Sequence, residues 1–85
     1  MTVFLDAREM TTHSRAHDHL SAQLQLPEHY GRNLDALYDI LTERSEPLYI
    51  TLSNKEFLDT YGIRIVQTIL DAASHNSGIF FMEKD

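Results

Sequence analysis

Three short apolar runs along the chain predict β-strands. They cover Thr2–Leu5, Leu48–Leu52 and Ile79–Met82, are rich in Val, Ile, Phe and Tyr, and are bounded by turn or charged residues. None of them alternates cleanly between apolar and polar residues, which is typical of strands covered on both faces, as in a parallel sheet. The pattern therefore favours three parallel strands.

The segments between these runs have the residue spacing of helices. The first follows a capping Thr11 or Thr12, repeats apolar residues at every fourth position, and ends before Pro27. The second begins near Asn33, a favourable N-cap residue, and extends to about Glu43. Both are expected before the second strand.

The segment Gly62–Ser74 combines β-branched residues with helical spacing, and its length exceeds that of a usual strand, so we expect a helix. A weak helical turn is expected near Glu56–Leu58. The order is then β-α-α-β-(α)-α-β in one domain over residues 1–85, an α/β fold with helices packed around the sheet. The expected core contains Leu5, Leu34, Leu37, Leu41, Ile50, Ile65, Ile69 and Phe80.

The second helix has two distinct faces. A helical wheel groups its three leucines on one stripe, and Asp35, Asp39 and Thr42 on a neighbouring arc, with Glu43 just beyond and Tyr38 at the border. Like charges one turn apart destabilise a helix by about 0.2–0.5 kcal/mol per pair. This cost favours an acidic face kept for a partner; the alternative is a face that is simply solvated.

Composition narrows the class of partner. The net charge is −6, which weighs against nucleic acid and favours a basic protein partner; the alternative is that the charge only aids solubility. The chain has no cysteine, no run of eighteen apolar residues and no signal-peptide core near its first residues. We therefore expect a cytoplasmic protein with no membrane partner.

Metal binding and acid–base catalysis are the alternatives to a role in binding. His13 and His17 share a helix face, but a zinc site needs further ligands on the same side, so we expect neither a metal nor a cofactor. Asp35 and Asp39 could form an acid–base pair, yet such catalysis needs a concave pocket that separates their pKa values. An exposed helix face does not provide one, and we expect no enzyme.

Residues 26–42, LPEHYGRNLDALYDILT, resemble the barstar family of ribonuclease inhibitors, through the LPE, the YG, the NLDAL, the second aspartate and the final LT. The resemblance implies a three-stranded parallel sheet with helices on both sides. It also implies that the second helix and the loop before it block the active site of a basic extracellular-type ribonuclease, barnase-like or related, in a 1:1 complex. A barstar-like binding module for a non-ribonuclease toxin or regulatory partner remains the alternative.

By the same resemblance, Asp35 and Asp39 would be the central contacts. The predicted site also includes His29, Tyr30, Gly31, Asn33, Leu34, Tyr38, Thr42, Glu43, Arg44, Glu46 and the outlying Asp71. The chain departs from the family at His29, where tyrosine is common, and at Tyr38, where tryptophan is common. Arg32 replaces an acid and Arg44 an aromatic residue, which leaves the acidic centre intact and alters the rim.

Overall fold

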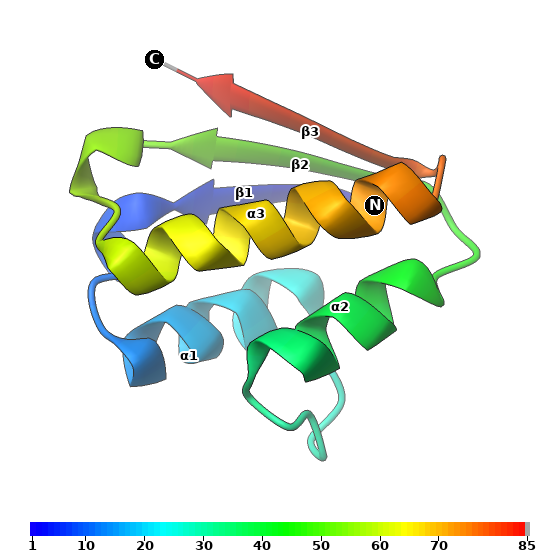
Figure 1. Cartoon of the computed structure of the whole chain (residues 1–85), viewed down its shortest axis with the longest axis horizontal. Coiled ribbons are helices and arrows are strands. Elements are labelled where there is room, and N and C mark those ends of the chain that lie inside the picture. Colours follow the sequence, from blue (N-terminus) through cyan, green and yellow to red (C-terminus); the bar gives the residue numbers. More distant parts are fainter. Residues whose placement is uncertain (85) are drawn as a thin grey trace.

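The computed structural model describes residues 1–84 and contains a three-stranded parallel sheet in the order β1–β2–β3 (Figure 1). The strands are β1 (Thr2–Asp6), β2 (Leu48–Ser53) and β3 (Ile79–Lys84). The helices are α1 (His13–Leu24), α2 (Leu34–Thr42) and α3 (Thr60–His75), and two 3₁₀ turns are η1 (Ala7–Glu9) and η2 (Lys55–Phe57). The predicted α/β class and order of elements are confirmed.

Polar caps decide where two of the helices begin. The Thr12 hydroxyl accepts a hydrogen bond from the Arg15 amide at 3.1 Å, and the Asp59 carboxylate accepts one from the Gly62 amide at 2.8 Å. Each bond satisfies an amide that has no partner within its own helix. Because Asp59 is the cap, α3 begins at Thr60, two residues before the predicted start.

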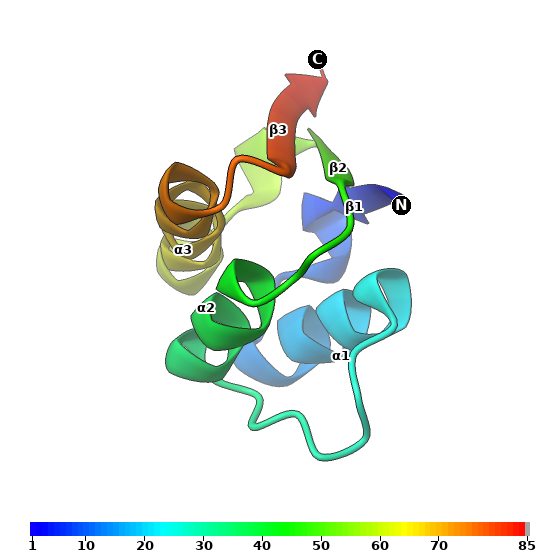
Figure 2. The ribbon, with the colours of Figure 1, turned by 90° about the vertical axis from the view of Figure 1, so that its right-hand side faces the viewer.

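The helices cover one face of the sheet, so the expectation of helices on both sides was wrong (Figures 1 and 2). Strand residues alternate in exposure: Val3, Leu5, Leu48, Ile50, Leu52 and Ile79 are buried, whereas Phe4, Tyr49, Phe80 and Met82 are exposed. The open face is itself rich in apolar side chains, which hides the alternation in the sequence. Phe80, predicted in the core, lies on this open face.

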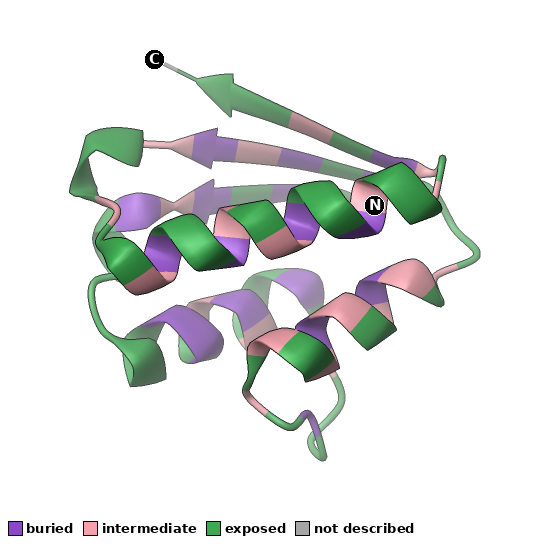
Figure 3. Cartoon of the chain, viewed as in Figure 1, coloured by how far each residue is buried: buried purple, intermediate pink, exposed green. Residues whose placement is uncertain are grey.

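The core fills the space between the sheet and the helices (Figure 3). Of the predicted core residues, the buried ones are Leu5, Leu37, Leu41, Ile50, Ile65 and Ile69. Leu34 is only half-buried, because it lies in the first turn of α2 at the edge of the core. Helix α2 packs mainly against α3, so its opposite side remains at the surface. No helix within residues 1–84 is long and apolar enough to cross a membrane.

Candidate functional site

Asn33 sets the start of helix α2. Its side-chain oxygen accepts a hydrogen bond from the Ala36 amide at 2.8 Å, and its side-chain nitrogen donates to the Gly31 carbonyl at 3.1 Å. The first bond caps the helix, and the second ties the cap to the preceding loop. One side chain therefore fixes the direction in which both the loop and α2 leave the core.

The acidic side of α2 is exposed, and its carboxylates form no ion pair within residues 1–84. Asp35, Asp39 and Glu43 are all exposed, while Leu37 and Leu41 on the other side are fully buried. The ion pairs within residues 1–84 use other carboxylates, those of Asp6, Glu9, Asp18 and Glu83. The packing of the leucines thus holds three unneutralised carboxylates in a row along one surface.

The loop before α2 is anchored by Tyr30, whose ring is only 7 % exposed. Its hydroxyl lies 2.7 Å from Nδ1 of the buried His17, and Nε2 of His17 lies 2.6 Å from the hydroxyl of Tyr61 on α3. Burial raises the pKa of Tyr30 to about 12, so the phenol stays protonated. Tyr30 was predicted to contact a partner, but its ring presents almost no surface and instead links the loop to α1.

Arg32 supplies a second anchor for the same loop. Its guanidinium donates to the Ser14 carbonyl at 3.0 Å and pairs with Asp18 at 2.9 Å, both on α1. The left-handed backbone conformation also falls on Arg32, with φ of 55°, and not on Gly31. Gly31 serves a different need, because a Cβ there would lie 3.2 Å from the Cβ of Ala36. Between the two anchors, His29 remains exposed.

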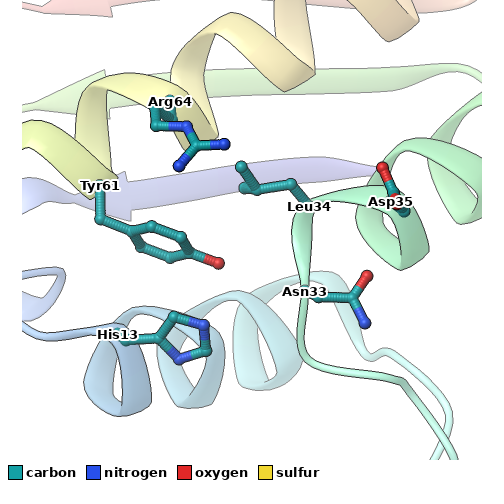
Figure 4. Close-up of a pocket in the computed structure, with 6 residues that line it drawn as sticks. All are labelled: His13, Asn33, Leu34, Asp35, Tyr61 and Arg64. Carbon is teal, nitrogen blue, oxygen red and sulfur yellow. The ribbon is translucent and has the colours of Figure 1, made fainter.

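A hollow of about 450 Å³ opens at the N-terminal end of α2 (Figure 4). It is lined by Asn33, Leu34 and Asp35 of the predicted site, by His13, which the sequence suggested only as a metal ligand, and by Tyr61 and Arg64, which the sequence did not single out. These last three come from α1 and α3, and nothing local in the sequence relates them to α2. Their alignment along the same hollow depends on the packing of the three helices.

A second hollow, of about 300 Å³, lies at the C-terminal end of α2 and is lined by Glu43, Arg44, Ser45 and Glu46. The chain here is held by Asn76, whose side-chain nitrogen donates to the carbonyls of Leu41 and Arg44, each at 3.0 Å. Arg44 is half-buried and its guanidinium lies 3.6 Å from the sulfur of Met1, so much of it faces the protein itself.

Tyr38 connects the acidic side of α2 to α3. Its hydroxyl lies 3.2 Å from Nδ1 of His75, and the two rings meet edge to face with centroids 6.2 Å apart. Asp71 is exposed and lies one helical turn before His75, which places it near the same side of α2. The Thr42 hydroxyl donates to the Tyr38 carbonyl at 2.9 Å, so it is partly engaged within the helix.

The two histidines considered for zinc are arranged differently from a metal site. Both ring nitrogens of His17 lie within hydrogen-bond distance of tyrosine hydroxyls, and its ring is 4.7 Å from that of His13. No group of three or more metal-ligating side chains occurs within residues 1–84. The cluster therefore has a structural use, which is to join α1, α3 and the loop.

Comparison with known families identifies the architecture. A family model described as "Barstar (barnase inhibitor)" matches residues 1–79. The chain belongs to the barstar family. Members of this family are inhibitors and not enzymes.

A similar protein supports the same assignment. A protein of Bacillus subtilis (strain 168) named "Putative ribonuclease inhibitor YrdF" is 42 % identical over 60 residues, which is 69 % of this chain. The match spans 66 % of the length of that relative.

In this barstar-family chain most of the predicted site residues lie at the surface, and Tyr30 lies inside the protein. Those exposed along the loop and α2 are His29, Gly31, Asn33, Asp35, Asp39 and Glu43, with the half-buried Leu34, Tyr38 and Thr42 beside them. Arg44 and Glu46 lie beyond the C-terminal end of α2, and Asp71 lies on α3. Tyr30 and its partner His17 are inside the protein, where they support the loop.

Proposed function

We propose that this protein inhibits a basic extracellular-type ribonuclease, barnase-like or related, by placing α2 and the loop before it in the active site. The carboxylates of Asp35 and Asp39 take the place of substrate phosphates among the cationic groups of the enzyme. The inhibitor acts as a single domain in the cytoplasm and forms one complex per enzyme molecule. Membership of the barstar family supports the inhibitor class, and the exposed acidic row supports the mode of binding.

The observation that carries the proposal is the row of unpaired carboxylates on a helix whose other side is buried. Three acids at intervals of one turn repel one another in the free protein. A basic partner removes that repulsion and gains charge-assisted hydrogen bonds to each carboxylate. The row is therefore more favourable in a complex than in the free chain.

Cations at the ends of α2 restrict where a basic partner can sit. Arg64 lines the hollow beside Asp35, and Arg44 lines the hollow beside Glu43. A cation of the enzyme placed opposite Arg64 or Arg44 would be repelled, which disfavours that alignment of the two proteins. The positive groups of the enzyme should consequently face the middle of the row, where Asp39 lies, rather than its ends.

Anchoring of the loop reduces the entropic cost of binding. Tyr30 and Arg32 hold it to α1, and Asn33 holds it to α2, before any partner arrives. Side chains that are already ordered lose less freedom on association than mobile ones. His29 and Gly31 are thus presented on a preformed surface beside Asp35.

The proposal is tested by titrating a barnase-like ribonuclease with the protein and measuring RNA hydrolysis and calorimetric stoichiometry. We expect inhibition at one inhibitor per enzyme, with association that slows as salt is raised because exposed charges are screened. The control is a variant with Asp35→Asn and Asp39→Asn, which should fold equally well and inhibit much less. Equal inhibition by wild type and this variant would contradict the proposed mode. Tight binding to a basic non-ribonuclease toxin instead would favour the alternative of a different partner.

A further inference from the structure

The open face of the sheet carries an apolar surface that nothing within residues 1–84 covers. Phe4 is 65 %, Tyr49 48 %, Phe80 50 % and Met82 62 % exposed. The rings of Tyr49 and Phe80 already stack, with centroids 5.0 Å apart and an interplanar angle of 11°. Sheets made only of parallel strands normally have both faces covered, so this face lacks an expected layer.

We propose that this open face docks a second copy of the chain and forms a symmetric dimer. The strand register arranges the outward residues in three rows across the sheet. The first row has Thr2, Tyr49 and Phe80, the second has Phe4, Thr51 and Met82, and the third has Asp6, Ser53 and Lys84. Two rows are mainly apolar, and the third carries opposite charges on its two edges.

A two-fold axis parallel to the strands makes these rows complementary to themselves. Such an axis places β1 of one copy over β3 of the other, with the two sheets about 10 Å apart and nearly aligned. Phe4 then meets Met82, a favourable aromatic–sulfur contact, and Phe80 meets the smaller Thr2. The two β2 strands run along the axis on opposite sides of it, so Thr51 faces Thr51 of the other copy.

The charged third row favours an axis parallel to the strands over an axis across the strands. With the axis parallel to the strands, Asp6 of each copy faces Lys84 of the other, whereas an axis across the strands sets Lys84 against the apolar first row. Asp6 already binds Arg8 at 2.8 Å and Asn54 at 2.9 Å. Lys84 is exposed and has no ion pair within the described residues, so it can join this group from outside.

The size of the face predicts a weak dimer. The four large apolar side chains expose roughly 400 Å² per copy, a value typical of the largest apolar patch on a protein surface. With the smaller residues of the three rows, two copies bury roughly 1,000 Å², the lower limit for a specific interface. Because α2 lies on the other side of the sheet, each copy keeps its acidic row free for one partner (Figure 2).

Analytical ultracentrifugation of the wild type, Phe4→Lys, Met82→Lys and Phe57→Lys tests the dimer. Phe57 is a matched control, because it is 51 % exposed but lies on η2, outside the three rows. As concentration rises to about 1 mM, the wild type and Phe57→Lys should increase in mass from the 9.8 kDa of one chain toward twice that value. The dimers of Phe4→Lys and Met82→Lys should be weakened by about tenfold or more, with far-UV circular dichroism confirming that both fold.

A cysteine at the axis tests the orientation. The chain has no native cysteine, so Thr51→Cys treated with a short bis-maleimide should give a covalent dimer, whereas Gln67→Cys on the exposed side of α3 should not. A wild type that keeps the mass of one chain at about 1 mM, or lysine variants that associate like Phe57→Lys, would overturn the proposal. Equal cross-linking of the two cysteine variants would contradict the proposed position of the two-fold axis.

Discussion

His17 joins the loop before α2 to the helical layer, and replacing it with phenylalanine should make the protein less stable and remove part of its acid sensitivity. The imidazole is 0 % exposed and contacts the hydroxyls of Tyr30 and Tyr61 at 2.7 and 2.6 Å. In His17→Phe the buried hydroxyl of Tyr30 loses its partner, at a cost of about 1–3 kcal/mol, while the half-buried Tyr61 can bind water. We therefore expect about 1–3 kcal/mol of destabilisation at pH 7.5.

The pH dependence separates this effect from simple loss of packing. Burial, together with the nearby positive charges of His13 and Arg32, lowers the pKa of His17 from 6.5 to about 4. Between these values the unfolded chain binds more protons than the folded one, so the stability of the wild type falls as pH falls. At pH 4.5 this single group accounts for a loss of about 2–3 kcal/mol relative to pH 7.5.

Urea denaturation at pH 7.5 and 4.5 measures both quantities. The destabilisation caused by His17→Phe should shrink by about 2–3 kcal/mol between the two pH values, because the variant has no histidine to protonate there. Burial also lowers the pKa of His19, but that contribution is present in both proteins and cancels. His29→Phe, at an exposed position, is the control and should follow the wild type. Parallel loss of stability in the wild type and His17→Phe would refute the reasoning.

Further predictions concern the loop and helix. Asn33→Ala removes the bond to the Ala36 amide and should cost about 1 kcal/mol in urea denaturation, and an unchanged stability would show that the cap is dispensable. Asp39→Ala should leave the fold intact and raise the free energy of unfolding by about a few tenths of a kcal/mol in thermal melting. A stability equal to that of the wild type would show that the carboxylates of the row do not repel one another.

Local signals in the sequence were sufficient for much of the fold. Asn33 was recognised as a cap, and the leucine spacing after it placed the buried side of α2, because both depend on residues within one or two turns. The strand positions followed from β-branched and aromatic residues. The exposed acidic row was predicted in the same way, since a helix of known phase assigns each residue to a face.

Contacts between segments that are distant in the sequence could not be predicted from these local signals. Tyr30 was assigned to the surface because its partner His17 is 13 residues away and its support from α3 passes through Tyr61. The coverage of the sheet was misjudged since Phe4 and Phe80 are apolar yet exposed, so the strands did not show the alternation of a half-covered sheet. Where an open face is apolar, the residue pattern alone cannot distinguish it from a buried one.

We propose that the acidic row of α2, with Asp39 at its middle, dominates the binding of a basic ribonuclease. The most direct measurement is the dissociation rate of the complex for wild type, Asp39→Ala and Glu56→Ala, all with melting curves. Glu56 is exposed on η2 and its removal changes the net charge equally. Losing Asp39 leaves cationic groups of the enzyme buried and unpaired, which should cost about 2–5 kcal/mol, mostly through faster dissociation. Asp39→Ala should therefore dissociate at least about tenfold faster than Glu56→Ala, and equal rates would contradict the account.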